Sequence, residues 1–333
     1  MKKHIVTSPE GEAVLALLRE SDSVALTTHE GPDGDGIGSE IALARALRTL
    51  GKRVHVINPA KSARRFQFLD HDNDIHAFKP DLARTLMDVD LVLLVDTCEL
   101  RRSGPVGPIL EERSGPTAAI DHHPPNDHSI DGILASDYSS TGELMVHVLD
   151  ALGVDLTADL AFPLYSAILF DTNQFQFVRN DPEVFAVAAR LVASGADAEK
   201  AAHCLFGSVS RDRVVLQGRV LGSADFELDG RLACARVTPQ EMSDLDVDSD
   251  DVRSMVMLLA ATDGVDIAVL FKVFREGKVK VSIRSPGNIT INDVAATLGG
   301  GGHPFAAGAD VMGTLDDVME RTLNMLREKL SVA

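Results

Sequence analysis

The fold of this chain is decided by the stretch His29-Glu30-Gly31-Pro32-Asp33-Gly34-Asp35-Gly36-Ile37-Gly38-Ser39. Residues 23–28 before it form a short, partly β-branched apolar run, which predicts a buried strand. Residues 37–50 after it have the apolar spacing of a helix, and Gly51 ends that pattern. The turn therefore lies at the carboxyl end of a predicted strand, the edge where open α/β sheets bind ligands.

The glycines of this turn invite other interpretations, which the neighbouring side chains exclude. A dinucleotide-binding turn would bring a pyrophosphate against Asp33 and Asp35, and these carboxylates would repel it. A P-loop needs a Gly-Lys-Ser/Thr sequence that the turn lacks, and an EF-hand needs an oxygen ligand where the chain has Ile37. Two interpretations remain open at this point: half of a metal site, or a solvated Pro-Asp-Gly turn, since both use these residue types.

Composition limits the class of protein. At 333 residues, of which 45% are hydrophobic, the chain is long enough for two domains with their own cores. It has no apolar stretch of membrane-spanning length and its first residues are polar, so we expect a cytoplasmic protein without a membrane partner. Cys98, Cys204 and Cys234 have no paired spacing, which argues against a disulfide framework and a zinc ribbon.

The net charge of the chain limits its partners. A formal charge of -18 repels long polyanions, so we expect no binding of long duplex nucleic acid. Any phosphate-bearing ligand must be small or held locally. The acidic stretch 241–251 is expected to be a solvated loop or helix start.

The apolar runs that follow the first turn predict a parallel sheet. A strand at 53–57 comes after the first helix, and a strand-helix-strand unit of this length makes its two strands parallel. Further runs at 90–95 and 117–120 are continuous enough to be buried on both faces. The first of these ends in Asp96-Thr97 and the second in Asp121-His122-His123, so polar residues again begin where a strand stops.

Helical patterns follow the sheet. Ser140 and Glu143 have the spacing of a capping box that opens a helix to about residue 152. The amphipathic segment 158–170 delivers Asp171 at its end, and Pro182 begins a further helix.

We therefore expect an α/β domain with a parallel sheet at 1–195, a helical linker at 196–222 and a smaller α+β domain at 223–333. The last domain is expected to contain strands at 231–237, 265–274, 278–284 and 309–312, helices near Val252 and Asn292, and a terminal helix at 314–330.

Polar groups gather at one edge of the first domain, and they are His29, Asp33, Asp35, Asp96, His122 and Asp171. Ligands that are mostly oxygen, with a minority of imidazoles and no thiolate, favour Mn²⁺, with Mg²⁺, Co²⁺ and Fe²⁺ as alternatives. Four massed carboxylates repel one another without cations, so the set predicts two metals bridged by one carboxylate, which we assign to Asp96.

These motifs carry a family resemblance. The chain resembles the DHH phosphoesterase superfamily in Asp121-His122-His123, in His-x-x-Pro-Asp-x-Asp at 29–35, in Asp96-Thr97 and in Asp171-Thr172. The Gly-Gly-Gly-Gly-His sequence at 299–303 and Ser282-Ile283-Arg284-Ser285 are similar to the DHH-associated domain. Length and domain content resemble the NrnA group, oligoribonucleases that also dephosphorylate 3'-phosphoadenosine 5'-phosphate, more than the RecJ-type exonucleases.

The resemblance implies a role for each residue of the metal site. His29, Asp33 and Asp96 would hold one manganese ion, and Asp35, Asp96, His122 and Asp171 the other. The two ions would activate a water molecule for in-line attack on phosphorus. His123 would hydrogen-bond a non-bridging phosphoryl oxygen, and Asp121 would orient His122 without binding metal.

The resemblance also implies a phosphate site in the second domain. Arg284 and Ser285 would bind a terminal phosphate together with Gly300, Gly301, Gly302 and His303, because glycine backbone N-H groups can approach an anion closely. The alternatives are a flexible hinge for the glycines and a surface charge for Arg284. Arg102 resembles an arginine that follows the Asp-Thr motif, with a plain surface role as its alternative.

Two departures from the family pattern are visible. Asn173-Gln174 stands where family members often carry glycine after Asp-Thr, and Pro304 follows His303. Phe175 and Phe177 come after the last aspartate, where we expect a role in the core, with stacking on a base as the alternative.

The function implied is that of a manganese-dependent phosphodiesterase that cleaves nanoRNA and linear dinucleotides to mononucleotides, with phosphatase activity on 3'-phosphoadenosine 5'-phosphate. The alternatives are a cyclic-dinucleotide phosphodiesterase, an inorganic pyrophosphatase, which the glycine-rich second domain argues against, and an inactive nucleotide-binding regulator. A homodimer is expected from the resemblance alone.

Overall fold

The structure, a computed structural model, describes residues 5–126, 128–178, 180–247, 252, 255–275, 277–287 and 289–332. It divides into two compact units, Met1–Ser208 and Val209–Ala333. Among the described residues no helix is both long enough and apolar enough to cross a membrane.

The first unit is built on a six-stranded parallel sheet, as the sequence predicts. Its strand order is β3-β2-β1-β4-β5-β6, so the order reverses between the adjacent strands β1 and β4. The strands are β1 (Ser23–Thr27), β2 (Arg53–Asn58), β3 (Ile75–Ala77), β4 (Leu91–Val95), β5 (Thr117–Asp121) and β6 (Gly132–Leu134). In such sheets ligands bind beyond the carboxyl ends of the strands at the reversal point.

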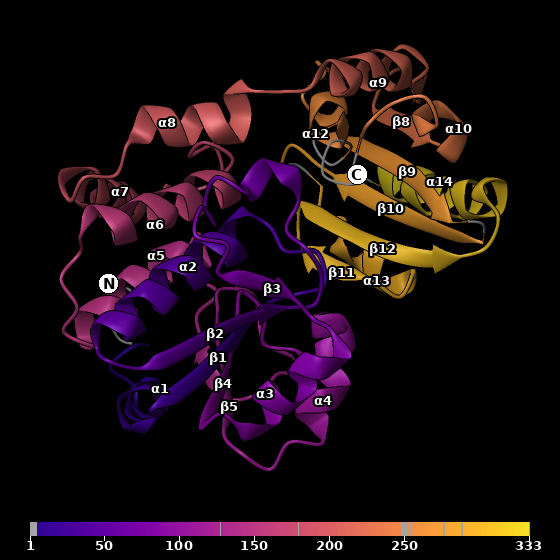
Figure 1. Cartoon of the computed structure of the whole chain (residues 1–333). Helices are drawn as coiled ribbons and strands as arrows, with labels where there is room; N and C mark the ends of the chain where they lie inside the picture. Colours follow the sequence, from indigo (N-terminus) through magenta and orange to yellow (C-terminus); the bar gives the residue numbers. More distant parts are fainter. Residues whose placement is uncertain are drawn as a thin grey trace. The chain divides into compact units, whose positions relative to one another are not determined.

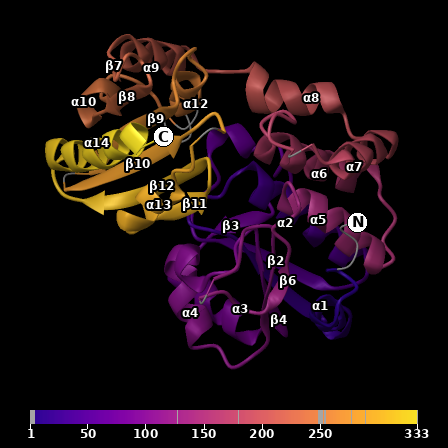
Figure 2. The same cartoon turned by 180° about the vertical axis from the view of Figure 1, so that it is seen from behind.

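Helices cover both faces of this sheet (Figures 1 and 2). One core joins the sheet to α1 (Pro9–Glu20), α2 (Gly34–Thr49), α5 (Thr141–Ala151), α6 (Ala158–Asp171) and α7 (Pro182–Ala193). The other core joins it to α3 (Ala83–Asp88), the 3-10 helix η4 (Leu100–Val106) and α4 (Gly107–Glu111). Short 3-10 helices at η2 (Arg64–Phe66) and η3 (Pro80–Leu82) complete the loops.

Helices α2 and α6 approach closely because α2 carries glycine where they touch. A Cβ added at Gly38 would lie 2.5 Å from the carbonyl oxygen of Pro163, and one at Gly34 would lie 2.6 Å from Cγ of Phe170. The close approach brings the end of α6, where Asp171 lies, beside the start of α2, where Asp35 lies.

Replacing Gly38 by alanine should therefore destabilise the protein by about 2 kcal/mol, because the new methyl group meets backbone that cannot move aside cheaply. Gly218 in α9 (Arg211–Gly222) is the matched control, since a Cβ there has no heavy atom within 4 Å. Gly218→Ala should raise stability by up to about 1 kcal/mol through helix propensity. Thermal unfolding of both variants tests this, and equal effects would contradict the packing described here.

The second unit is a six-stranded sheet of order β11-β12-β10-β9-β8-β7. Only β8 and β9 pair in parallel, and the other neighbours are antiparallel. Its strands are β7 (Asp225–Glu227), β8 (Leu232–Val237), β9 (Ile267–Arg275), β10 (Lys278–Arg284), β11 (Gly301–His303) and β12 (Ala306–Met312). Part of the glycine run is thus a strand, which sequence reasoning missed because glycine has no side chain to form a pattern.

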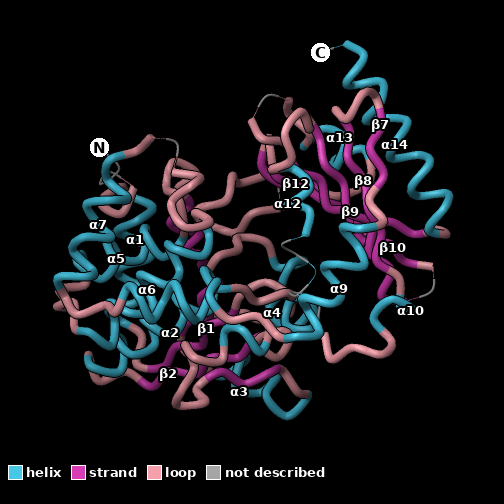
Figure 3. The backbone as a smooth tube through the Cα atoms, turned by 90° about the horizontal axis from the view of Figure 1, so that it is seen from above, coloured by secondary structure: helices cyan, strands magenta, loops and turns pink. Residues whose placement is uncertain are grey.

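The helices of the second unit lie on both faces of its sheet (Figure 3). One core contains α9 and α12 (Met255–Ala260), with α10 (Pro239–Met242) beside it, and the other contains α13 (Asn292–Thr297) and α14 (Leu315–Val332). The stretch 196–222 is helical throughout most of its length. Its parts α8 (Ala198–Ala202) and η5 (His203–Gly207) contribute to the core of the first unit, whereas α9 contributes Leu216 and Val220 to the second.

Candidate metal centre

The six expected metal ligands lie at the reversal point of the first sheet. His29 follows β1, Asp96 directly follows β4, and His122 directly follows β5. Asp33 caps the amino end of α2, and Asp35 is in its first turn. Asp171, the sixth ligand, is the last residue of α6. Five different elements therefore bring these side chains to one edge of the sheet.

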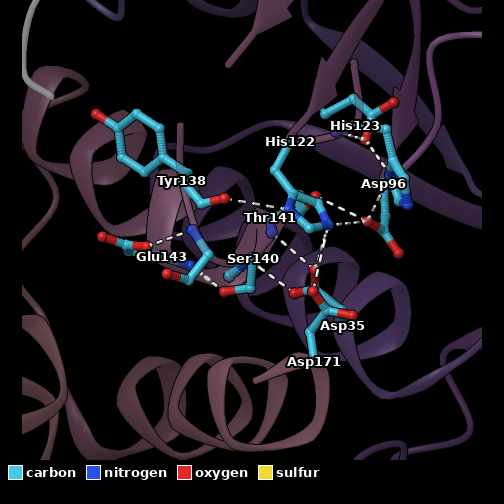
Figure 4. Close-up of polar contacts among 12 residues, drawn as sticks. Asp35, Asp96, His122, His123, Tyr138, Ser140, Thr141, Glu143 and Asp171 are labelled. Atoms are coloured by element: carbon cyan, nitrogen blue, oxygen red, sulfur yellow. Dashed lines mark hydrogen bonds and ion pairs between the residues drawn. The ribbon is translucent and has the colours of Figure 1, made fainter. Parts of the chain in front are cut away.

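The imidazoles of His29 and His122 face two groups of carboxylates. The Nε2 atom of His29 is 3.6 Å from Asp96 Oδ2 and 4.0 Å from Asp33 Oδ1. The Nε2 atom of His122 is 3.4 Å from Asp171 Oδ2, 3.7 Å from Asp35 Oδ2 and 3.8 Å from Asp96 Oδ1 (Figure 4).

Asp96 is close to both histidines, with Oδ2 near His29 and Oδ1 near His122. These separations exceed ordinary hydrogen-bond lengths, and they leave room for a cation between the ligand atoms. Ligand atoms lie within 4.8 Å of one another in three sets: His29, Asp33 and Asp96; Asp35, His122 and Asp171; and Asp96, His122 and His123.

The amino end of α5 holds two of the carboxylates in place. The backbone N-H groups of Thr141 and Gly142 donate to Asp35 at 2.7 and 2.8 Å, and the hydroxyl of Thr141 donates to Asp96 Oδ1 at 2.8 Å. Ser140 caps this helix, as predicted. Sequence reasoning recognised the helix start but missed that its free N-H groups bind a carboxylate, although helix amino ends commonly bind anions.

The electrostatics of the site favour a cation. Burial raises the pKa of Asp35 well above its ordinary value, and the carboxylates of Asp96 and Asp171 raise it further. Burial also raises the pKa of Asp171. A divalent ion would offset both effects by stabilising the charged carboxylates. The donor set, two imidazoles with four carboxylates and no thiolate, fits a hard or borderline divalent cation such as Mn²⁺.

Asp96 occupies an unusual backbone conformation. Its φ angle is +62°, in the left-handed region that aspartate tolerates better than most residues. Because such conformations are strained, they persist where the surroundings hold them, and they cluster at functional sites.

The expectation that Asp121 orients His122 is not what the structure shows. Asp121 Oδ1 instead accepts the backbone N-H of His123 at 3.0 Å and lies 2.8 Å from Nδ1 of its ring. The chain turns sharply after β5, which folds His123 back over Asp121. His122 Nδ1 lies 3.4 Å from the carbonyl oxygen of Tyr138, so a backbone group takes the orienting position.

Asp121 and His123 shift each other's pKa in opposite directions. Burial lowers the pKa of His123, but the hydrogen bond and charge of Asp121 outweigh it and raise that pKa to about 9. Burial raises the pKa of Asp121, and the contacts with His123 outweigh it, so this pKa lies well below its usual value. Arg102 is close enough to lower the pKa of His123, and its carbonyl oxygen accepts the N-H of Glu30 at 2.6 Å.

A buried carboxyl that no sequence pattern marked lies near the site. Glu40 on α2 is fully buried, and Asn58 Nδ2 donates to its Oε2 atom at 2.8 Å. Burial raises the pKa of Glu40 to about 8, and the charge of Asp96 contributes. Glu40 is therefore mostly protonated in the folded protein at neutral pH.

The pKa of Glu40 predicts a pH-dependent cost of folding. The pKa of Glu40 is near 4.5 in the unfolded chain and about 8 in the folded protein. Between these two pH values the folded protein binds one more proton than the unfolded chain, so the free energy of unfolding falls as the pH rises from about 4.5 through 8. In EDTA, Glu40→Gln should match the parent protein below pH 4.5 and be more stable by about 4 kcal/mol at pH 9. Urea unfolding at the two pH values measures this, and parallel stability curves for both proteins would contradict it.

The second unit groups the expected phosphate-binding residues at one end of its sheet. Arg284 on β10 pairs with Ala306 on β12, which pairs with His303 on β11, so the three side chains share one face. Ser285 follows Arg284, and its hydroxyl accepts the N-H of Ile289 at 3.3 Å.

The glycines beside this face are needed for close packing of the backbone. A Cβ at Gly300 would lie 2.1 Å from the carbonyl oxygen of Gly308, and Gly302 has a φ angle of +137°. Gly301 pairs with Gly308 and is exposed. The glycine run is thus part of the sheet edge, and the hinge alternative does not hold for Gly301 and Gly302.

Comparison with known families matches both units. Residues 23–168 match the DHH family, N-terminal domain, and residues 229–331 match the DHHA1 domain. The bifunctional oligoribonuclease and PAP phosphatase NrnA of Thermus thermophilus is 36% identical over 317 residues, which cover 93% of this chain and 91% of that protein.

Solved structures agree in fold. An exopolyphosphatase-related protein from Bacteroides fragilis has a TM-score of 0.87 at 25% identity, covering 96% of this chain and 97% of that one. RecJ from Thermus thermophilus in complex with Mn²⁺ has a TM-score of 0.54 at 16% identity, covering 94% of this chain and 52% of that one. The second likeness is one of fold alone.

Proposed function

This chain belongs to the DHH family, and we propose that it is a metal-dependent phosphoesterase that hydrolyses short oligoribonucleotides to mononucleotides. We also propose that it removes a phosphate from 3'-phosphoadenosine 5'-phosphate, since the Thermus relative is named for both activities. One observation supports the proposal most strongly. Two clusters, each of one histidine with carboxylates, lie on either side of Asp96, which is close to both histidines.

The proposed cofactor is a pair of Mn²⁺ ions, with Mg²⁺ or Co²⁺ as substitutes. His29, Asp33 and Asp96 would hold one ion, and Asp35, His122 and Asp171 would hold the other, with Asp96 shared because it lies near both His29 and His122. The RecJ structure with Mn²⁺ supports this choice through its fold. Such a pair of ions activates water at neutral pH and offsets the charge of the transferring phosphoryl group.

The chain's own residues would orient the substrate. Asp121 engages Nδ1 of His123, and the ring would donate a hydrogen bond from Nε2 to a non-bridging phosphoryl oxygen. Thr141 and Gly142 keep Asp35 and Asp96 in position while the phosphoryl group is transferred. Arg102, near His123, would add a positive charge toward the phosphate.

The proposed terminal-phosphate site consists of Arg284, Ser285, His303 and the glycines Gly300, Gly301 and Gly302. Arg284 supplies a planar fork suited to phosphate, and the glycines allow a close approach of backbone N-H groups. Short substrates fit the net charge of -18, because a long strand would be repelled outside the site. The cytoplasmic location and the homodimer stay predictions.

The test is product analysis by ion-pair chromatography with Mn²⁺. The substrates are a linear dinucleotide, a five-nucleotide RNA, 3'-phosphoadenosine 5'-phosphate, a cyclic dinucleotide and pyrophosphate, with His122→Ala as the inactive control. We expect mononucleotides from the first two substrates and AMP from the third. Cleavage of the cyclic dinucleotide alone would favour the alternative activity, and binding without turnover of any substrate would favour a regulator.

A further inference from the structure

Two side chains of the candidate metal centre are more exposed to solvent than its other members. The side chains of Asp171 and His123 are 31% and 28% exposed, whereas His29 is 13% exposed and Asp35 is 1% exposed. We therefore expect a substrate phosphate to approach the carboxylates beside Asp171 and His123. The segment 172–177 directly follows Asp171 in the chain.

That segment, the turn at residues 172–177, has a strained backbone. Asn173, Gln174 and Phe175 have φ angles of +46°, +60° and +63°, three consecutive left-handed residues without a glycine among them. Asparagine tolerates the left-handed region better than most side chains, which fits its presence at the first of these positions. Strain of this kind is kept where a structure uses the conformation.

Thr172 fixes the shape of the turn. Its buried hydroxyl accepts the N-H of Phe175 at 3.0 Å, and its carbonyl oxygen accepts the N-H of Phe177 at 3.0 Å. The N-H of Gln174 donates to the carbonyl oxygen of Leu169 at 2.8 Å, which ties the turn to the last turn of α6. The backbone of Phe177 is therefore hydrogen-bonded to Thr172, which directly follows the expected metal ligand Asp171.

The two phenylalanines of the turn have different environments. The ring of Phe175 lies 5.4 Å from that of Phe185 in a stacked arrangement and 6.3 Å from that of Tyr165, so it packs inward as expected. Phe177 is 53% exposed, which contradicts the core role expected for it. Gln174 and Gln176 beside it are also exposed. The turn thus presents an exposed aromatic ring and two exposed glutamine residues that precede it in the chain.

We propose that Phe177 stacks on a nucleobase of the substrate whose phosphate lies at the metal centre. This inference rests on the proposed function and adds to it a nucleoside-recognition site. In the proposed function the metal centre contacts the phosphate and makes no contact with the base. Selection of nucleotides over other phosphate esters therefore requires a separate contact. An aromatic ring supplies it without sequence preference, because every base has a π-face.

The first test uses the absence of tryptophan from the chain. Phe177→Trp introduces a single fluorescent reporter, and stacking of adenine should quench it when AMP is added with Mg²⁺. Ribose 5-phosphate, which carries the phosphate without the base, should leave the signal unchanged. Phe226→Trp is the matched control, since Phe226 in the second unit is 50% exposed, and AMP should not quench it.

The second test is kinetic. Phe177→Ala should raise KM for a linear dinucleotide about 10-fold with little change in kcat, since base stacking on an aromatic ring is worth one to two decades in affinity. KM for the same dinucleotide with abasic sugars should not change, and Phe177→Tyr should restore the parent value.

Equal quenching of Phe177→Trp by ribose 5-phosphate, or no quenching by AMP, would overturn the stacking proposal. An equal rise in KM for the abasic dinucleotide would also overturn it, because the ring would then act on the fold of the site. Quenching by AMP in a protein that cleaves no dinucleotide would refute the proposed function and leave the nucleobase site standing.

Discussion

Asp96→Asn should lower kcat for a linear dinucleotide by at least about 1000-fold in saturating Mn²⁺. Among the residues that the structure describes, Asp96 is the carboxylate that faces both histidines, His29 through Oδ2 and His122 through Oδ1. An amide of the same size keeps the shape of the site but removes the negative charge that two cations would share. Steady-state turnover and the bound Mn²⁺ content, measured by atomic absorption, report the loss.

Asp131→Asn is the matched control, since Asp131 is an exposed aspartate of the same unit. It should keep parent activity and parent metal content. If Asp96→Asn retained more than about a tenth of the parent kcat, the assignment of Asp96 as the shared ligand would be wrong.

Mn²⁺ should raise the melting temperature of the metal-free protein by roughly 5 to 10 °C at a free concentration 100 times the dissociation constant. Binding to the folded state alone gives about 2.7 kcal/mol for each site at this concentration. Relief of the cost that burial and neighbouring carboxylates impose on charged Asp35 and Asp171 is part of the affinity itself. Differential scanning fluorimetry after EDTA treatment measures the shift.

His122→Ala should show a much smaller rise in melting temperature with Mn²⁺, because it removes the imidazole that faces Asp35 and Asp171. Its melting temperature in EDTA should stay close to that of the parent, which separates metal binding from folding. An equal Mn²⁺ shift in parent and variant would place the ions elsewhere.

The sequence was sufficient to predict which candidate metal ligands come together, because their placement follows from simple geometry. Parallel strands end at one edge of a sheet, so His29, Asp96 and His122 had to lie near one another once the three strands were recognised. Asp171 is at the end of a helix, and its position depends on the close approach of α2 and α6 that Gly38 permits. The motif resemblance predicted that Asp171 joins the site, because strand geometry alone does not place the end of a helix.

Other features depend on contacts that no local pattern encodes. Strands β3, β6 and β11 have three residues each, too few to form an alternating pattern. Asp121 and His123 pair through a sharp turn, and Glu40 meets Asn58 across 18 positions of sequence. The exposure of Phe177 follows from a left-handed turn that favours glycine, at positions where this chain has none.

Anomalous diffraction at the manganese absorption edge, from crystals grown with MnCl₂, would show whether two metal ions share Asp96. We expect two peaks about 3.5 to 4 Å apart. One should lie among His29, Asp33 and Asp96, and the other among Asp35, His122 and Asp171, with Asp96 touching both. A single peak, or two peaks without Asp96 between them, would contradict the account.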